Sequence, residues 1–285
     1  MFVRIIPAFI LAAILSSCAV QKNTVNARLD AEMPRRIIWA WERPEDLSGF
    51  DAKEFGVAFL AQTLFLENGS INRKPRMQPL ETADGAYIIA VTRIETNKST
   101  AKRPTLDDEM AAKTADLIAA TRTLPNMRGV QVDFDAVVSE RDFYRKMMFE
   151  LRRLLSEPPA SAGGQNAGSE DTDGNESVNE RTNTHHSPPA IHPTLTMTSL
   201  ASWCTGDAWF NDFPVDEAVP MAFQMGADSE KIRTYMRNGN DWIEPLCRGS
   251  YGISLDEGLL DGMKPGRRIY YFKNSAWKQG DLSGL

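Results

Sequence analysis

The chain has 285 residues, of which 42% are hydrophobic, and a formal net charge of -6 with an isoelectric point near 5.3. This acidic balance lacks the basic footprint with which proteins hold nucleic acid, so we expect no nucleic-acid partner. The chain has three histidines and three cysteines but no CxxC pair. We therefore expect neither a metal site nor a cofactor.

The N-terminus predicts export. One basic residue, Arg4, precedes an apolar run that is too short to span a membrane as a stable helix, and the sequence LSSC follows. Small residues before Cys18 resemble the lipobox of bacterial lipoproteins, in which the cysteine becomes the acylated first residue. An ordinary secretory signal with an accidental cysteine is the alternative.

The resemblance implies a signal peptide at 1–17, an acylated Cys18 and a linker over 18–34 that tethers one domain at 35–285. Ala19 stands where an aspartate would retain a lipoprotein at the inner membrane. The implied location is therefore the periplasmic face of the outer membrane, where the lipid on Cys18 would anchor the protein. No later segment of the sequence is long and apolar enough to span a bilayer.

Eight apolar segments along the chain predict strands. They are 36–42, 55–66, 87–95, 129–135, 195–203, 217–225, 250–255 and 268–277. Helical spacing predicts helices at 107–123, 139–155 and 229–237. The tract 157–193 has almost no large apolar residue, so it predicts a disordered insertion. The insertion separates the helix at 139–155, which follows the fourth strand, from the fifth strand of the same domain.

These segments predict an α/β fold, a TIM-like (β/α)8 barrel with a degenerate outer ring of helices. Without the insertion about 210 residues remain, which is the small end of the range for such barrels. A doubly wound open sheet is the alternative, but no GxGxxG or GxxxxGK[ST] fingerprint follows any strand.

The strand at 129–135 carries an unusual polar face. Gln131, Asp133 and Asp135 alternate with apolar residues, so they share one side of the strand. In a barrel this side faces the interior and rises toward the C-terminal mouth, where active sites of this architecture lie. The bland interpretation is that the buried acids are satisfied by neighbours, with Arg93 on the preceding strand pairing with Asp133.

The same crowding also suits catalysis. Two carboxylates two residues apart on a strand repel, which raises the pKa of one of them toward neutrality. Asp135, nearest the mouth, is then the candidate general acid. Asp133 would hold or tune it, and Gln131 would support the pair by hydrogen bonds.

At these residues the sequence resembles the fourth-strand signature DGxDxDxE of chitinase-like family 18 glycoside hydrolases. Gln131 falls on the second aspartate of that signature, Asp133 on the third and Asp135 on the catalytic glutamate. Met221-Ala222-Phe223-Gln224 resembles the sixth-strand motif M-x-Y-D, and Trp277 stands where the family places a tryptophan floor under the sugar. The resemblance implies a glycan substrate with Gln131, Phe223, Gln224 and Trp277 among its contacts.

This sequence departs from the family pattern at three of those positions. Asp135 is shorter than glutamate, Phe223 lacks the tyrosine hydroxyl, and Gln224 replaces an acid. Over nearly the whole mature chain, the stretches IWAWERPEDL, VQVDFDAVVSERDFY, ASWC, VPMAFQMG and GSYGISLDE resemble a family of bacterial exported proteins catalogued as a domain of unknown function.

A conventional glycosidase needs a second carboxylate across the scissile bond. Acids near other strand ends are Glu42, Glu67, Glu95 and Asp256, of which Glu42 and Glu95 form the preferred pair.

Aromatic side chains near strand ends suit the apolar faces of sugars. They are Trp39, Trp41, Trp203, Trp209 and Trp277, with Trp41 and Trp277 as candidate sugar contacts, and core packing is the alternative for at least half of them.

Export into an oxidising compartment predicts a Cys204–Cys247 disulfide, with two buried free thiols as the alternative.

The leading hypothesis is an envelope glycoside hydrolase-like protein that acts on a polysaccharide or peptidoglycan-type glycan. The alternative is a barrel without catalysis that binds carbohydrate or envelope components. A glycosyltransferase-type DxD motif is disfavoured, because nucleotide sugars are cytosolic. The oligomeric state is left open.

Overall fold

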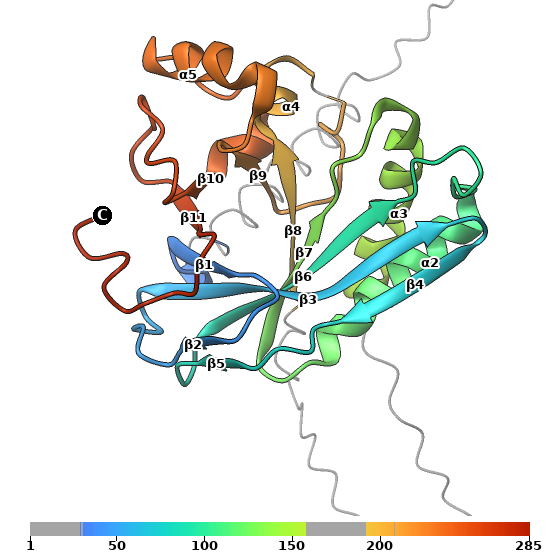
Figure 1. Ribbon diagram of the computed structural model, residues 1–285, viewed down its shortest axis with the longest axis horizontal. Helices are drawn as coiled ribbons and strands as arrows, with labels where there is room; N and C mark the ends of the chain where they lie inside the picture. Colours follow the sequence, from blue (N-terminus) through green and yellow to red (C-terminus); the bar gives the residue numbers. More distant parts are fainter. Residues whose placement is uncertain (1–28, 30, 158–191, 208) are drawn as a thin grey trace, which may run out of the picture.

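A computed structural model describes residues 29, 31–157, 192–207 and 209–285 (Figure 1). The predicted signal peptide at 1–17, the candidate lipidation residue Cys18, and nearly all of the tract 157–193 lie outside this part. Within the described part, no helix has the length and apolarity needed to span a bilayer.

Eight parallel strands form a closed barrel, as the sequence predicted. Around the barrel their order is β1, β11, β10, β9, β8, β7, β6 and β3, and β1 closes the ring by pairing with both β3 and β11. The strands are β1 (Arg36–Ala40), β3 (Phe55–Glu67), β6 (Tyr87–Thr96), β7 (Met127–Asp133), β8 (Thr194–Leu200), β9 (Glu217–Met221), β10 (Ser250–Ser254) and β11 (Arg268–Phe272).

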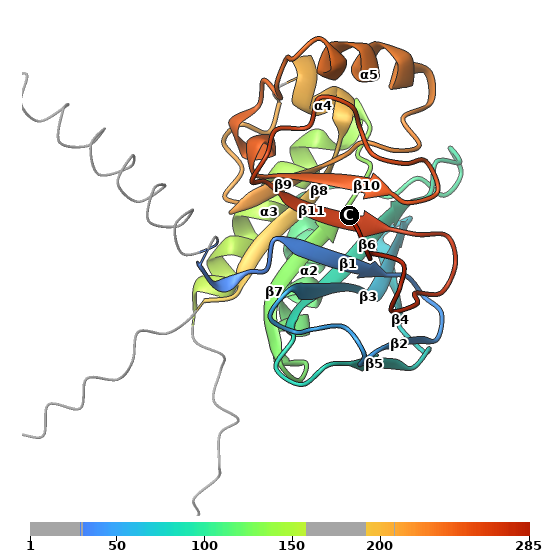
Figure 2. The ribbon, with the colours of Figure 1, turned by 90° about the vertical axis from the view of Figure 1, so that its left-hand side faces the viewer.

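Helices accompany only part of the barrel. They are α2 (Asp108–Ala119), α3 (Arg141–Ser156), α4 (Ala201–Gly206) and α5 (Ser229–Arg237), with short 3-10 turns η1 (Ala120–Thr123), η2 (Val138–Glu140), η3 (Gly226–Asp228) and η4 (Pro245–Gly249). α2 and α3 pack side by side on one flank, and α4 and α5 lie together on another (Figures 1 and 2). The fully described connections β1–β3, β3–β6 and β10–β11 contain no α-helix.

Three short strands were not predicted. β4 (Ser70–Pro75) folds back antiparallel on β3, while β2 (Glu45–Leu47) pairs in parallel with β5 (Leu80–Thr82). Asn68 begins the hairpin turn with a φ of 51°, a backbone conformation that asparagine tolerates better than most residues. Asn-Gly between two strands is a hairpin signal, so the β3–β4 hairpin was readable from the sequence.

The barrel separates two apolar cores. Outside, Val130, Val132 and Phe134 of the β7 segment pack under α2 and α3. Inside, side chains from β1, β3, β6, β9 and β11 fill the barrel around Trp39 and Tyr270. Period-two alternation along each strand produces this division.

The N-terminal end of the barrel is closed. Arg268 and Glu217 form a salt bridge of 2.9 Å there, with both side chains 2% exposed, and the Tyr270 hydroxyl donates to the same carboxylate at 3.1 Å. Leu29 and Met33 pack into the interior core from below, so the last residues of the predicted linker segment lie against the barrel. Among the described residues, these contacts fill the N-terminal end of the barrel.

β7 is positioned by close packing on its neighbour. A Cβ at Gly129 would lie 2.4 Å from Thr194 Oγ1 of β8, so only glycine allows this approach. Gln131 and Asp133 are buried on the interior face, and the strand ends at Asp133. Asp135 lies just beyond the strand end, where the prediction had still placed strand, and it reaches the mouth.

Candidate functional site

A cavity of about 450 Å³ opens at the C-terminal mouth of the barrel. It is lined by Trp39, Trp41, Arg43, Arg93, Asp133, Asp135, Leu200, Met221, Phe223, Gln224, Ser254, Phe272, Lys273 and Asn274. These residues come from the ends of seven barrel strands and the segments that follow them. This is where the barrel architecture places catalytic groups.

Asp133 forms the floor of the acidic side. Its Oδ2 accepts a hydrogen bond from Arg93 Nη1 at 2.9 Å, and its Oδ1 accepts one from Thr198 Oγ1 at 2.8 Å. This is the pairing with Arg93 that the bland interpretation of the acids expected, so Asp133 is satisfied by its neighbours. With both oxygens occupied and the side chain buried, Asp133 is held in one orientation.

Asp135 differs sharply from Asp133. It is exposed at the mouth and forms no hydrogen bond or salt bridge with any described residue. Desolvation by the surrounding walls raises the pKa of the Asp135 carboxyl, and the Asp133 carboxylate raises it further. Arg93 and Lys98 act in the opposite direction but do not cancel the shift. The Asp135 carboxyl thus keeps its proton to a higher pH than an ordinary aspartate and can donate it to a ligand.

An aromatic wall faces these acids. Trp41, Trp39, Phe272 and Phe223 form a continuous series of ring contacts, with successive centroids 5.2, 4.2 and 4.7 Å apart. In the strand order, β11 lies four strands from β7 in either direction, so Phe272 stands opposite the acids. Rings on one side and a proton donor on the other suit a ligand with apolar faces and hydroxyl edges.

The other cations at the mouth are already engaged. The Arg43 guanidinium donates to Glu45 Oε1 at 2.5 Å and to the carbonyl oxygens of Lys273 and Asn274. Lys273 Nζ pairs with Asp281 at 2.5 Å. These contacts brace the segments after β1 and β11, and they leave a mouth suited to an uncharged ligand.

The other predicted site residues fall in different places. Gln131 lies buried below Asp133 and donates to Thr196 Oγ1 at 3.1 Å; within the described residues it forms no hydrogen bond to Asp133. Phe223 and Gln224 line the cavity as expected, although Gln224 does so from a backbone with a φ of 49°.

Neither preferred second carboxylate lines the cavity. Glu42 has the parity of Ala40, which faces away from the barrel interior, and it pairs with Lys74 at 3.2 Å. Glu95 has the inward parity but lies at the rim, where it accepts a hydrogen bond from Arg93 Nε at 3.0 Å. Asp133 and Asp135 are the only carboxylates among the residues that line the cavity.

Trp277 is not a floor for the cavity. β11 ends at Phe272, and the chain then turns, so that Trp277 is buried and its indole N–H donates to the carbonyl of Trp39 at 3.0 Å. Phe272 occupies the place that the sequence analysis gave to Trp277. Asn274-Ser275, a pair of turn-forming residues, was the signal for the earlier strand end.

The remaining tryptophans belong to the outer layer. Trp203 and Trp209 contact each other edge to face, and Trp209 contacts Phe210 and Phe213 in the same way, within the outer core. Nearby, Cys204 and Cys247 form the predicted disulfide, which links α4 to η4.

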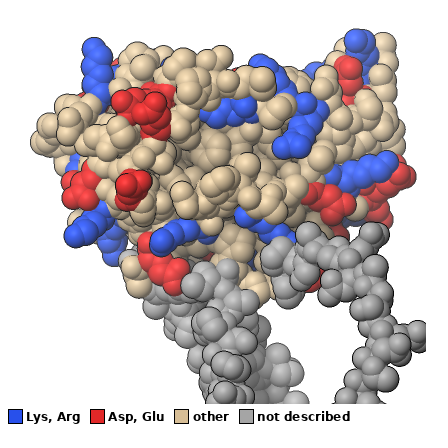
Figure 3. Space-filling model, turned by 90° about the horizontal axis from the view of Figure 1, so that it is seen from below, with Lys and Arg blue, Asp and Glu red and all other residues tan. Residues whose placement is uncertain are grey.

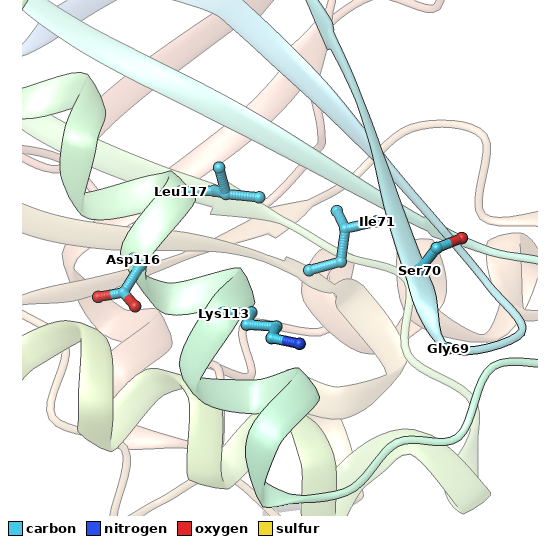
Figure 4. A pocket seen from close by; sticks show the side chains of 6 residues that line it. All are labelled: Gly69, Ser70, Ile71, Lys113, Asp116 and Leu117. Carbon is cyan, nitrogen blue, oxygen red and sulfur yellow. The ribbon is translucent and has the colours of Figure 1, made fainter.

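The other described surfaces have fewer reactive groups than the mouth of the barrel. A groove of about 420 Å³ lies between the tip of the β3–β4 hairpin and α2 (Figure 4), and its only cation, Lys113, pairs with Glu109 at 2.6 Å. On the face shown in Figure 3, basic and acidic side chains are interspersed around a centre of other residues. Within the described part of the chain, no cluster of three His, Cys, Asp or Glu side chains could hold a metal ion.

Comparisons with protein-family models, curated proteins and solved structures found no match to this chain.

The electrostatic coupling of the two aspartates is directly testable. In Asp133→Asn, we expect the pKa of Asp135 to fall toward its ordinary value, because the raising effect of the Asp133 carboxylate disappears while Arg93 remains. Carbon-13 NMR titration of the Asp135 carboxyl measures the shift. Thr198→Val, which removes a hydrogen bond to Asp133 but no charge, should change the Asp135 pKa less. An unchanged or higher pKa in Asp133→Asn would contradict the assigned coupling.

Proposed function

We propose that this protein is a glycoside hydrolase-like barrel that binds an uncharged glycan at its mouth and cleaves it with Asp135 as general acid. The observation that carries the proposal is the pairing of an unengaged carboxyl of raised pKa with an aromatic wall across one cavity. The resemblance of β7 and the β9 end to chitinase-like glycoside hydrolases supports the same assignment.

The chemistry follows from these positions. Asp135 gives its proton to the glycosidic oxygen as the carbon–oxygen bond of the sugar breaks. Water adds to the anomeric carbon, and the proton that this water loses restores the Asp135 carboxyl. Asp133, fixed by Arg93 and Thr198, acts as a positioning residue that keeps the pKa of Asp135 raised.

The pH dependence follows from the protonated form being the active one. Because the pKa of Asp135 is raised, the active form persists to higher pH than for an ordinary aspartate, and turnover should fall as pH rises through that pKa. The same shift means that the fold favours the protonated carboxyl. The stability contributed by this preference is present below the unfolded-state pKa and is lost as pH rises through the folded-state pKa.

The decisive experiment is Asp135→Asn against a panel of glycans. We expect kcat to fall by about a hundredfold or more, because proton transfer contributes at least this much to such reactions. The urea midpoint at neutral pH should be unchanged or higher, since asparagine carries no charge to desolvate. Asp84→Asn, an exposed position at the opposite end of the barrel, is the matched control and should keep full activity. Full turnover by Asp135→Asn would refute the role of Asp135.

The second candidate is a carbohydrate-binding barrel without turnover. It is favoured by the absence of a carboxylate opposite Asp135 among the cavity residues, where the wall is Phe272 and Asn274. A protein of this kind would bind members of the same glycan panel with equal affinity before and after Asp135→Asn, and would release no product.

The proposal places the protein in the cell envelope. It includes a signal peptide at 1–17, a lipid on Cys18, a location on the periplasmic face of the outer membrane, and a single domain from residue 35 onward. The barrel is proposed to be a TIM-like (β/α)8 barrel whose outer ring of helices has degenerated. Most of the residues that carry the resemblance to chitinase-like glycoside hydrolases line the mouth cavity, namely Asp133, Asp135, Met221, Phe223 and Gln224.

A further inference from the structure

The lining of the mouth cavity runs almost completely around the barrel. Its residues come from β1, β6, β7, β8, β9, β10 and β11 or from the segments that follow these strands. Of the eight described barrel strands, only β3 contributes none, and β3 stands between β1 and β6. Arg93 of β6 spans this gap, because its guanidinium lies 5.5 Å from the centre of the Trp41 ring, just after β1. The lining residues therefore form a ring around a pit.

Hydrogen bonds join one half of the rim into a single wall. The Arg43 guanidinium, after β1, donates to the carbonyl of Asn274, after β11, at 3.0 Å. The N–H of Asn274 donates in turn to Asp256, after β10, at 2.8 Å. The N–H of Gln224, after β9, donates to Glu257, also after β10, at 3.0 Å. The segments above β9, β10, β11 and β1 thus hold one another in place.

Side chains join the other half of the rim. Arg93 of β6 donates to Asp133 of β7 at 2.9 Å, and Thr198 of β8 donates to the same carboxylate at 2.8 Å. Leu200, at the end of β8, lies opposite Met221 of β9 in the strand register, and both line the cavity. A glycan chain that passed through the site would have to cross this linked ring on two sides.

The volume and depth of the pit limit how much of a glycan it can enclose. A cavity of about 450 Å³ lies in the lower half of the range, roughly 300–1,000 Å³, of sites that enclose a drug-sized ligand. A disaccharide has that size, whereas a longer chain does not. Asp133 is 5% exposed at the strand end, and Asp135, two residues further along, is exposed. The bond that Asp135 can protonate therefore lies near the rim, with the enclosed sugar below it.

We infer that the protein acts on the end of a glycan chain and takes about one or two terminal sugar units into the pit. This inference rests on the proposed function and adds to it the part of the glycan that is recognised. Hydrolysis beside Asp135 adds one water across the glycosidic bond. The hydroxyl of the water goes to the anomeric carbon and a proton goes to the departing oxygen, so that a mono- or disaccharide is released.

Binding of oligomers of increasing length tests the size of the pit. Asp135→Asn is titrated in a calorimeter with β-1,4-linked oligomers of glucose, mannose and N-acetylglucosamine that contain one to six units. For the sugar that binds, we expect the affinity to rise from one unit to two. From two units to six it should change by less than about twofold, because further units remain in solvent and bury no additional surface.

The products of the unsubstituted protein test which bond is cleaved. Hexamers of the same three sugars are reduced with borohydride, which labels the reducing end, and the products are identified by mass spectrometry early in the reaction. We expect a mono- or disaccharide and the complementary longer fragment. An unlabelled short product means that the pit holds the non-reducing end, and a labelled one means that it holds the reducing end. Either product supports action on a chain end.

Trp41→Ala tests the wall itself. Loss of the indole opens the ring over β3, so that units beyond the second can extend through the gap. The ratio of tetramer affinity to dimer affinity should therefore rise by about threefold or more, although both affinities fall with the loss of an aromatic contact. Leu124→Ala, at an exposed position before β7 and so at the other end of the barrel, should leave the ratio unchanged. Circular dichroism checks that both variants are folded.

The outcomes separate the two proposals. Trisaccharides as the main early product, an affinity that keeps rising from two units to six, or an unchanged ratio in folded Trp41→Ala would each overturn the inference about chain ends while glycan binding stands. If no oligomer is bound or cleaved, the proposed function itself fails, and the inference fails with it.

Discussion

Replacing Arg268 with methionine is expected to lower the free energy of unfolding by about 3–5 kcal/mol, the cost of leaving a buried ion without its partner. Glu217 would lose the guanidinium at 2.9 Å and keep only the Tyr270 hydroxyl inside a closed barrel end. Arg268 also donates to the carbonyl of Pro34 at 3.0 Å, so the segment below the barrel would lose an anchor as well. Urea denaturation followed by circular dichroism measures the change.

A double variant distinguishes a lost charge partner from lost packing. Arg268→Met combined with Glu217→Gln removes both charges, so it should be more stable than Arg268→Met alone. The matched control is Arg153→Met on the exposed side of α3, where the pairs with Glu150 and Glu157 lie in solvent and the expected loss of stability is much smaller. Equal losses for Arg268→Met and Arg153→Met would show that the barrel end does not depend on its ion pair.

Removing the disulfide should have an effect of similar size. Cys204 and Cys247 are 43 residues apart, and closure of a loop of this length restricts the unfolded chain by about 4 kcal/mol in the chain-entropy model. We therefore expect Cys204→Ala with Cys247→Ala to lower the free energy of unfolding by up to about 4 kcal/mol. Both the variant and its parent carry Cys18→Ser, so that only this pair differs.

Reductant supplies an internal control for that result. Dithiothreitol should destabilise the parent by nearly the same amount and leave the double alanine variant unaffected. The Ser199 hydroxyl, 3.2 Å from Cys204 Sγ, lies beside the disulfide at the end of β8. If the urea midpoint of the parent does not respond to reductant, the link between α4 and η4 contributes nothing to stability.

Strand positions were predictable where apolar residues form continuous runs. β6 and β7 were found within two residues, because both faces of these strands are largely buried and apolar residues recur along them. The end of β8 was not found. In LTMTSLASW the apolar run continues past Leu200, but the chain becomes α4 at Ala201, and a short apolar run has no period that distinguishes a strand from a helix.

The acidic side of the site was predictable for a different reason. Parity along β7 places Asp133 inside the barrel, and adjacency of β6 and β7 places Arg93 beside it, so the sequence order of the strands is sufficient. The aromatic wall was only half predictable. Trp39 and Trp41 follow from parity on β1. The place of Phe272 depends on where β11 ends, and β11 ends five residues before the predicted strand 268–277 does.

The second carboxylate could not be located from sequence. Glu42 and Glu95 both lie near strand ends, and their distance from the mouth depends on how each chain segment bends after its strand. Glu42 pairs with Lys74 of β4, and β4 belongs to a hairpin that was not predicted. The position of Glu42 outside the cavity therefore could not be predicted without knowing of this hairpin.

Closure of the barrel joins its first strand, β1, to its last, β11. β1 pairs with β11, Arg36 opposite Ile269, and Arg268 donates to the carbonyl of Pro34. A chain synthesised from its N-terminus therefore carries an unpaired edge on β1 until its last strand has emerged. Pairing over such a separation is slow, and an open edge invites pairing with other chains. The pairing of β11 thus determines when the edge of β1 stops being open to other chains.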